Sequence, residues 1–360
     1  MTLTTVNAGM LDTPAQYTGF KNRIINGDMR INQRAISAQV PLASGVYLAD
    51  RWFYNANQST RFNAVGATTS TLDGFSNYLS FTSVGTFSPA AGDWQCEEQV
   101  IEGFNIADFG WGTVNAKAVT LSFRINSSLT GTFSGAIVNG GTTRSYPFTF
   151  SIPVANTWTT ISVTIAGDTT GTWATDNTAG LRVRFNLGTG TTYLGTAGSW
   201  AGTQYFGVTG SVNVSGTSGA TFYITGVQLE KGSTATSFDY RDYGRELIMC
   251  QRYLPVLDFA GGNAQSVLIG QANATTSCIY TVIFPVQTRT PPTSVSLTTA
   301  QFNCVTAAGG LSAISAIGFN SGSIFGSAFS VTTSGLVGGN ASALYANTNA
   351  AKILWNGCEL

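Results

Sequence analysis

Two adjacent glutamates, Glu97 and Glu98, are the strongest candidates for a catalytic pair of carboxyl groups. They lie in the run AGDWQCEEQ, which also contains Asp93. Paired carboxyl groups hydrolyse glycosidic bonds when they stand roughly 5–10 Å apart across a sugar. Neighbouring residues of a strand point to opposite faces, so Glu97 and Glu98 cannot share one sugar. We interpret these carboxylates as part of an ion-paired strand or a solvated edge, with glycoside hydrolysis as the alternative.

The 360 residues contain no histidine and five scattered cysteines. The missing imidazole excludes Ser-His-Asp and Cys-His nucleophiles, two-histidine zinc sites and histidine acid–base catalysis. The cysteines have no CxxC spacing, so we interpret them as small buried apolar residues. They are Cys96, Cys250, Cys278, Cys304 and Cys358. The sequence predicts a protein that is not an enzyme and has no cofactor.

Oxygen ligands for calcium are available in one predicted loop, which contains Asp168, Asp176 and Asn177. Calcium prefers such hard oxygen donors, but nothing here matches the spacing of a calcium-binding loop. Asp and Asn in loops also form turns by bonding to their own backbone. Turn formation is the favoured interpretation, and calcium at Asp168 and Asp176 is the alternative.

Aromatic residues are concentrated in the glycine-rich run 188–207, which contains Tyr193, Trp200 and Tyr205. An exposed ring stacks on the apolar face of a sugar while polar neighbours bond to the hydroxyls. We predict that any saccharide contact of this loop rests on Trp200, with Tyr193 and Tyr205 in support and Trp173 as the next ring. The favoured alternative is that these rings fold back and close the end of the domain.

Apolar and polar residues alternate with a period of two through most of 118–229, which is typical of half-buried antiparallel strands. Arg182 and Arg184 lie on the polar face of one such run; they could bind an acidic saccharide, although ion pairing is the favoured interpretation. Many short strands in about 200 residues predict an all-β fold, a jelly-roll β-sandwich. The alternating runs are 118–125, 146–152, 158–165, 181–187, 208–214 and 221–229.

The distribution of charge predicts the domain organisation. Residues 230–252 carry eight charged side chains, whereas the last 108 residues carry four. We predict an arm or anchor at 1–20, the jelly-roll module at 21–252 and a smaller β domain at 253–360 that forms a tip or an oligomer interface. Further expected elements are strands at 267–271, 276–284 and 293–299 and a helix at 244–254 that ends before Pro255.

Charged residues also cluster at both predicted ends of the jelly-roll module, in 21–34 and 239–242, with Asp50 and Arg51 between them. In a chain of which only 9% is charged, such clusters suggest one shared network of hydrogen bonds and ion pairs. We predict that this network joins the ends of the domain and has no catalytic role.

The net charge is zero, with 17 Lys and Arg against 17 Asp and Glu. No basic run offers a footprint for nucleic acid or an anionic membrane. The start MTLTTVNAGMLDTPAQ lacks the features of a signal peptide, and no run approaches the roughly 20 apolar residues of a membrane span. We expect synthesis in a cytoplasm, no nucleic-acid partner and no membrane insertion. The weakly charged C-terminal part predicts a homo-oligomer.

Several long motifs occur in a fixed order along the chain. They are GFKNRIINGDMRINQR at 19–34, LADRW at 48–52, IEGFNIADFGWGT at 101–113, SSLTGTF at 127–133, SVTIAGDTTGTW at 162–173, GTSGATFYITGVQLEKGSTATSF at 216–238 and RELIMCQRYL at 245–254. Over these residues the chain resembles tail-fibre, minor tail and other structural proteins of tailed bacteriophages, whose common module resembles a jelly-roll carbohydrate-binding domain.

This resemblance implies a virion protein that forms a homotrimer, assembles in the host cytoplasm and docks onto other virion proteins, here through the N-terminal arm. It implies a tail-fibre or receptor-binding role in which host-surface glycan is recognised. The alternative is a capsid decoration or head-fibre protein with a purely structural role, which the short run before the first motif keeps open.

Overall fold

The structure is a computed structural model that describes residues 20–35, 40–260 and 265–360. The chain divides into two compact units, one ending at Asp242 and the other running over Tyr243–Glu359. The sequence predicts this boundary between 252 and 253, but the structure assigns the helical residues Tyr243–Gln251 to the second unit. The predicted N-terminal arm lies outside the described residues, apart from Phe20.

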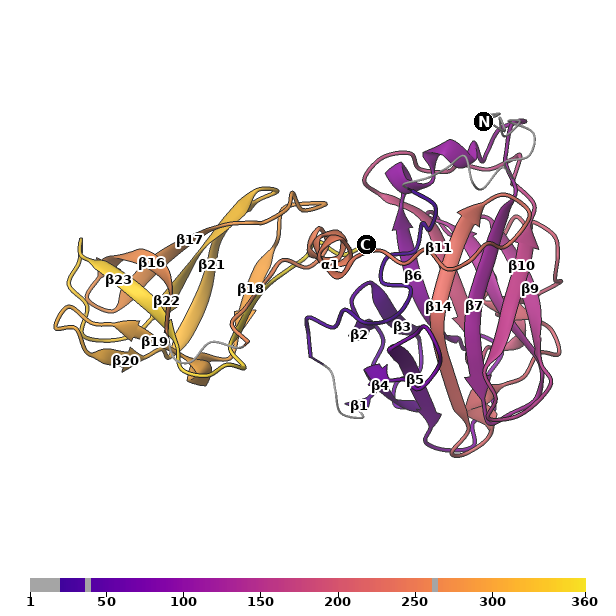
Figure 1. The fold of residues 1–360 in the computed structure, drawn as a ribbon, viewed down its shortest axis with the longest axis horizontal. Helices are drawn as coiled ribbons and strands as arrows, with labels where there is room; N and C mark the ends of the chain where they lie inside the picture. The colour runs from indigo at the N-terminus through magenta and orange to yellow at the C-terminus, as the bar shows by residue number, and fades with distance from the viewer. Residues whose placement is uncertain (1–19, 36–39, 261–264) are drawn as a thin grey trace, which may run out of the picture. The chain divides into compact units, whose positions relative to one another are not determined.

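The first unit is a sandwich of two six-stranded sheets, which confirms the predicted jelly-roll (Figure 1). Its main strands pair antiparallel. In spatial order, sheet A comprises β1 (Val40–Pro41), β4 (Phe62–Thr69), β5 (Asn77–Ser83), β14 (Thr221–Lys231), β7 (Val119–Ser127) and β10 (Thr159–Ile165). In the same way, sheet B comprises β2 (Tyr47–Ala49), β3 (Trp52–Ala56), β6 (Gln95–Glu102), β11 (Ala179–Asn186), β8 (Gly131–Asn139) and β9 (Ser145–Ile152).

The core between the sheets follows from the alternation in the sequence. On β7 the apolar residues of the predicted face are buried, and Phe123 meets Phe185 of β11 across the sandwich with 5.0 Å between ring centroids. Burying a side chain of this size stabilises the fold by about 1.5–3 kcal/mol. The intervening residues of both strands therefore occupy the outer faces of the sandwich, where any binding surface must be sought.

One predicted strand is wrong. In the run 208–214 only Val208 belongs to a strand, β13 (Gly207–Val208), which pairs with β12 (Leu194–Gly195). The rest is a turn that leads into a 3₁₀ helix, η6 (Val214–Gly216). Gly210 has a φ of 82°, a left-handed conformation that breaks extended structure and that glycine adopts without a steric penalty.

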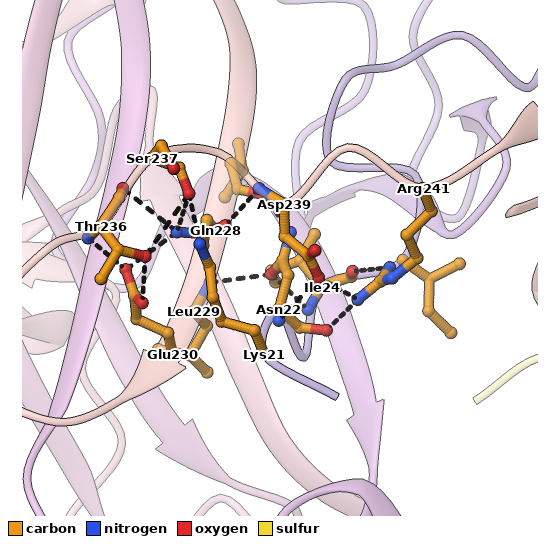
Figure 2. Close-up of polar contacts among 12 residues, drawn as sticks. Lys21, Asn22, Ile24, Gln228, Leu229, Glu230, Thr236, Ser237, Asp239 and Arg241 are labelled. Atoms are coloured by element: carbon orange, nitrogen blue, oxygen red, sulfur yellow. Dashed lines mark hydrogen bonds and ion pairs between the residues drawn. The ribbon is translucent and has the colours of Figure 1, made fainter. Parts of the chain in front are cut away.

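The predicted network between the ends of the first unit is confirmed (Figure 2). Arg241 is buried and donates hydrogen bonds to the carbonyl oxygens of Asn22 and Ile24, the latter at 3.0 Å. The backbone N–H of Asn22 donates to the Asp239 carboxylate at 3.3 Å, and the Asn22 side chain accepts from the N–H of Leu229 at 3.0 Å. These bonds fix the start of the sandwich against the end of β14.

The second unit confirms a smaller β domain. Its seven-stranded sheet comprises, in spatial order, β20 (Leu311–Ala313), β19 (Phe302–Val305), β23 (Ala341–Ala346), β16 (Gln265–Ala274), β17 (Ser277–Ile283), β22 (Gly326–Thr332) and β21 (Ala316–Ser323). A second sheet comprises β15 (Val256–Asp258), β24 (Lys352–Asn356) and β18 (Ser294–Leu297). Tyr280, Phe329 and Trp355 are buried in the core of this unit.

The expected helix is present as α1 (Tyr243–Gln251). The remaining 3₁₀ turns are η3 (Gly103–Asn105), η4 (Ala107–Phe109), η5 (Thr191–Tyr193) and η7 (Thr299–Gln301). All five cysteines are buried, as predicted, and carry free thiols. No helix in the described ranges is long and apolar enough to cross a membrane.

Candidate functional site

The outer face of sheet B is built around one buried carboxylate, that of Glu98 on β6. Arg184 lies directly opposite it on β11 and donates to one carboxylate oxygen, while Arg182 donates to the other at 2.5 Å. Burial alone would raise the pKa of Glu98, but the two guanidinium groups outweigh it and hold the pKa below its usual value. These arginines are therefore ion-paired, in line with the favoured interpretation.

The long segment between β11 and β14 lies over this face. The guanidinium of Arg184 stacks on the ring of Phe206, 4.1 Å from its centroid. When the side-chain amide of Gln204 is oriented with its oxygen towards Arg184, this oxygen accepts a hydrogen bond from the guanidinium at 2.8 Å. Sheet B therefore presents little of its charge to a ligand.

Trp200 lies in an aromatic cluster at the end of the sandwich. Its ring centroid is 5.3 Å from those of Trp111 and Tyr146 and 5.4 Å from that of Trp173. Its indole N–H donates to the carbonyl of Ala166 at 2.8 Å. Trp173 is thus a neighbour of Trp200, as expected. Both rings pack in the cluster that closes the end of the sandwich, which agrees with the favoured interpretation.

The other predicted rings lie elsewhere in the same segment. Tyr193 packs against Trp94 and Phe206, at centroid distances of 5.3 and 5.5 Å. Tyr205 has no ring contact with either cluster within the described part of the chain. The structure therefore does not bring Tyr193 and Tyr205 together with Trp200 on one platform, and saccharide binding by this loop remains a prediction.

Glu97 points away from Glu98, into the core, as the alternation predicts. It lies opposite Tyr54 on β3 and Phe185 on β11, and it is fully buried. Neither of its carboxylate oxygens, nor the Tyr54 hydroxyl, has a hydrogen-bond partner among the described residues. Burial, reinforced by the charge of Glu98, raises the pKa of Glu97 well above its usual value. The core therefore favours the neutral form of the Glu97 carboxyl group.

The two calcium candidates have separate protein partners. Asp168 is buried and accepts hydrogen bonds from Arg144 at 2.7 and 2.9 Å. Asp176 is exposed and accepts from the N–H and the hydroxyl of Thr178 at 2.9 and 2.6 Å. No group of three or more His, Cys, Asp or Glu that could hold a metal occurs among the described residues.

Aromatic rings are accessible on the outer face of sheet A. Tyr78 on β5 contacts Tyr223 on β14 with 5.0 Å between ring centroids, and contacts Trp158, the residue before β10, at 5.6 Å. All three side chains are partly exposed. We call Tyr78, Trp158 and Tyr223 the sheet A platform. Partial burial, and to a lesser degree the Tyr223 hydroxyl, raises the pKa of Tyr78, so its phenol is neutral.

Polar groups accompany the platform on β7. Asn126 lies opposite Tyr223, and its amide oxygen is buried without a hydrogen-bond partner in the described chain. Arg124, two residues earlier, lies between Thr225 of β14 and Thr160 of β10 in the register of the sheet. Diagonal neighbours of this kind are about 7–8 Å apart, within reach of long side chains, so Arg124 and Tyr223 belong to one surface.

A hollow of about 360 Å³ opens at the adjacent edge of the sandwich, between β9 and β10. Its lining includes Thr160, which also flanks Arg124. The platform therefore continues towards an uncharged, hydroxyl-bearing hollow. The lining residues are Thr149, Phe150, Ser151, Pro153, Thr159, Thr160, Ile161, Ser162 and Val163.

Sequence reasoning missed the sheet A platform, although the signal was present. In the run 221–229, Phe222 and Ile224 point into the core, so Tyr223 between them must point outward. Tyr78 likewise points outward, because the side chain of the next residue, Leu79, is buried in the core. An aromatic ring on the polar face of an alternating strand is the feature that would have identified the surface.

Comparison with known proteins gives distant structural similarity only. No family model matches the chain, and no curated protein matches it. A CBM4 carbohydrate-binding module is 13% identical, with a TM-score of 0.30, over 57% of this chain and 98% of the module. The CBM22 tandem domain of Paenibacillus barcinonensis Xyn10C is 10% identical, with a TM-score of 0.27, over 90% of this chain and 98% of that one.

The enzymatically active domain of tailspike protein 4 from bacteriophage CBA120 is 12% identical, with a TM-score of 0.33, over 59% of this chain. The match spans only 21% of the tailspike chain. These similarities concern the fold alone and assign no function to the chain.

Proposed function

We propose that the chain is a structural protein of a bacteriophage virion, a tail-fibre or receptor-binding protein that contacts host-surface glycan with the sheet A platform. The observation that carries this proposal is the group of three partly exposed rings on an outer sheet face. Such rings are rigid and amphipathic, so they stack on sugar rings with little loss of conformational entropy.

The surroundings of the platform suit a saccharide. Asn126, Thr160 and Arg124 place an amide, a hydroxyl and a guanidinium beside the rings. A few polar groups that converge on apolar surface fix the orientation of a ligand through its hydroxyls. Because these groups lie on paired strands, their spacing is fixed by the register of the sheet.

The virion assignment is supported by the ordered motifs over residues 19–254, which resemble those of tailed-phage structural proteins. We propose further that the protein has no hydrolytic activity. Glu97 lies in the core and Glu98 is bound by two arginines, so neither carboxyl is available for acid–base work on a sugar. Incubation with host polysaccharide should release no reducing ends.

Binding is tested on an array of bacterial surface glycans with the full chain. Wild type should bind at least one glycan, and Trp158→Ala should weaken that binding by about tenfold, because a stacked ring contributes on the order of 1.5 kcal/mol. Phe104→Ala is the matched control, since this ring is 58% exposed and lies outside the platform, in η3. Binding that survives in Trp158→Ala and Tyr223→Ala would contradict the proposal.

The position in the virion is tested by negative-stain imaging of particles labelled with an antibody to this chain. Label at the tail is the expected result. Label distributed over the head would contradict the tail-fibre role and support a capsid decoration protein.

We propose that the second unit joins copies of the chain into a trimer. The seven strands of its larger sheet, all within the described residues, contain no charged residue. Exposed apolar side chains lie on and beside this sheet: Ile269 is 78% exposed, Ile283 85% and Phe325 63%. Ile283 and Phe325 line a hollow of about 440 Å³. Identical uncharged faces can pack without repulsion, and closed cyclic symmetry is the usual arrangement of soluble homo-oligomers.

Sedimentation velocity tests this assembly. Wild type should sediment as a trimer, and Ile283→Asp combined with Phe325→Asp should sediment as a monomer with an unchanged β-sheet signal. Val337→Asp, at a half-exposed position outside the strands, is the control. A trimer that persists in the double variant would place the interface elsewhere.

A further inference from the structure

Arg124 on β7, beside the edge strand β10, is a cation on the outer face of sheet A that has no partner among the described residues. Its guanidinium makes no hydrogen bond or ion pair with any described residue, although the side chain is partly buried. Its stem packs at the β-bulge of β14, because a Cβ atom added to Gly226 would lie 3.3 Å from its Cγ. The ring of Phe75 lies at the same place, so the base of the side chain is supported while no described carboxylate binds its charged end.

Other arginines of the first unit show that this is a departure from the local pattern. Arg182 and Arg184 bind Glu98, and Arg144 binds Asp168. A partly buried cation costs free energy unless an anion compensates it. Arg61 also has no carboxylate partner among the described residues, but its guanidinium lies over the ring of Phe87. Arg124 has neither a carboxylate nor a ring of this kind among the described residues, which points to an anion supplied by a ligand.

The acidic residues near Arg124, Asp28 and Asp73, form no ion pair with it. Asp28 and Asp73, like Arg124, influence the pKa of the Tyr240 hydroxyl, so they belong to the same neighbourhood. Asp28 is bound by Arg30 at 2.9 Å. Asp73 is exposed and forms no ion pair with the described residues. An exposed carboxylate of this kind is largely screened by solvent, so it compensates the charge of Arg124 only weakly.

We infer that the sheet A platform selects acidic saccharides, in which a sugar ring stacks on the platform while a carboxylate, as in a uronic or sialic acid, binds the Arg124 guanidinium. A planar guanidinium matches a carboxylate with two parallel hydrogen bonds. The register places Arg124 diagonally from both Tyr223 and Trp158. One saccharide can therefore contact the aromatic rings and the guanidinium on the same surface. This inference rests on the proposed saccharide-binding function and adds the chemical class of the ligand.

The test is a glycan array in which each uronic or sialic acid oligosaccharide is printed twice, as the free carboxylate and as its methyl ester. Wild type should prefer the free acid by at least about tenfold, because a hydrogen bond to a charged group contributes more than a neutral one. The preference should weaken as salt is raised, since partly exposed charges are screened. Arg124→Gln should bind both forms equally, at the level at which wild type binds the ester.

Arg61→Gln is the matched control, because this arginine is also partly exposed but stacks on Phe87 outside the platform, 4.1 Å from the ring centroid. It should keep the preference for the free acid. Equal binding of acid and ester by wild type, or a preference that survives in Arg124→Gln, would overturn the inference and leave the proposed function standing. If wild type binds neutral bacterial surface glycans but no acidic saccharide in either form, the inference is overturned and the proposed function stands. If it binds neither class, both are contradicted.

Discussion

The two outer faces of the sandwich carry similar residues and use them differently. Sheet B turns Arg182 and Arg184 towards Glu98 and is covered by the segment that contains Phe206. Sheet A leaves Arg124 beside partly exposed rings, with no ion pair to any residue that the structure describes. A charged or aromatic side chain that points outward from a strand is therefore not by itself a binding site. Whether a ligand can reach it depends on which distant segments of the chain cover it.

The sharpest test of this difference is the same substitution on both faces. Arg184→Gln should reduce the free energy of unfolding by about 3 kcal/mol, because it removes one partner of a buried ion pair. Arg124→Gln should change it by less than about 0.5 kcal/mol, as for a surface position without partners. Urea denaturation of the two variants and wild type measures both.

Equal losses in these two variants would show that Arg124 also has a structural partner. A loss at Arg184 below about 0.5 kcal/mol would show that its ion pair with Glu98 is loose in solution. Either result would remove the distinction between the two faces.

The tryptophans extend the comparison from charge to rings. Trp200→Ala should lower the stability by about 2 kcal/mol, somewhat less than for a fully buried ring, because it empties the cluster with Trp111 and Trp173. Trp158→Ala should lower it by about 1 kcal/mol or less, since its ring lies on an outer face. Differential scanning calorimetry gives the two values.

A stable Trp200→Ala variant that has lost glycan binding would reverse this assignment. It would restore the loop 188–207 as the saccharide site and leave the sheet A platform without a role.

The contributions of Glu97 and Glu98 to the stability of the fold should depend on pH in opposite directions. The pKa of Glu97 is raised in the folded state by burial, so its contribution is fully present below the unfolded-state pKa of about 4.3 and is lost as the pH rises towards the folded-state pKa. Glu97→Gln should therefore stabilise the protein relative to wild type at pH 8, and the difference should shrink towards pH 4. Thermal unfolding across this range measures it.

Glu98→Gln provides the control of opposite sign. The pKa of Glu98 is lowered, because its arginines outweigh the effect of burial, so its contribution is present above the unfolded-state pKa and is lost as the pH falls. This variant should be less stable than wild type at pH 8. A Glu97→Gln difference that is constant with pH would show that Glu97 finds a partner in solution.

The fold could be predicted from the sequence because alternation is a local signal: β7 and β11 bury the apolar face expected of them. The run 208–214 failed because Gly210 takes a positive φ that an alternating pattern does not reveal. The opposite orientations of Glu97 and Glu98 were also predictable from strand geometry.

The platform could not be predicted in full because it depends on pairing between distant strands. The outward orientation of Tyr223 can be derived from its neighbours, but its contact with Tyr78 requires β5 to lie beside β14. In the same way, only the structure shows that Phe206 covers Arg184 and that no described segment pairs with Arg124.

Hydroxyl-radical footprinting of the full chain, with and without the tightest-binding glycan of the array, tests the central claim most directly. Oxidation of Tyr78, Trp158 and Tyr223 should fall when the glycan is bound, while oxidation of Tyr193 and Trp200 should not change. Protection confined to the loop 188–207, with the three platform residues oxidised as in the free protein, would contradict the assignment of saccharide binding to sheet A.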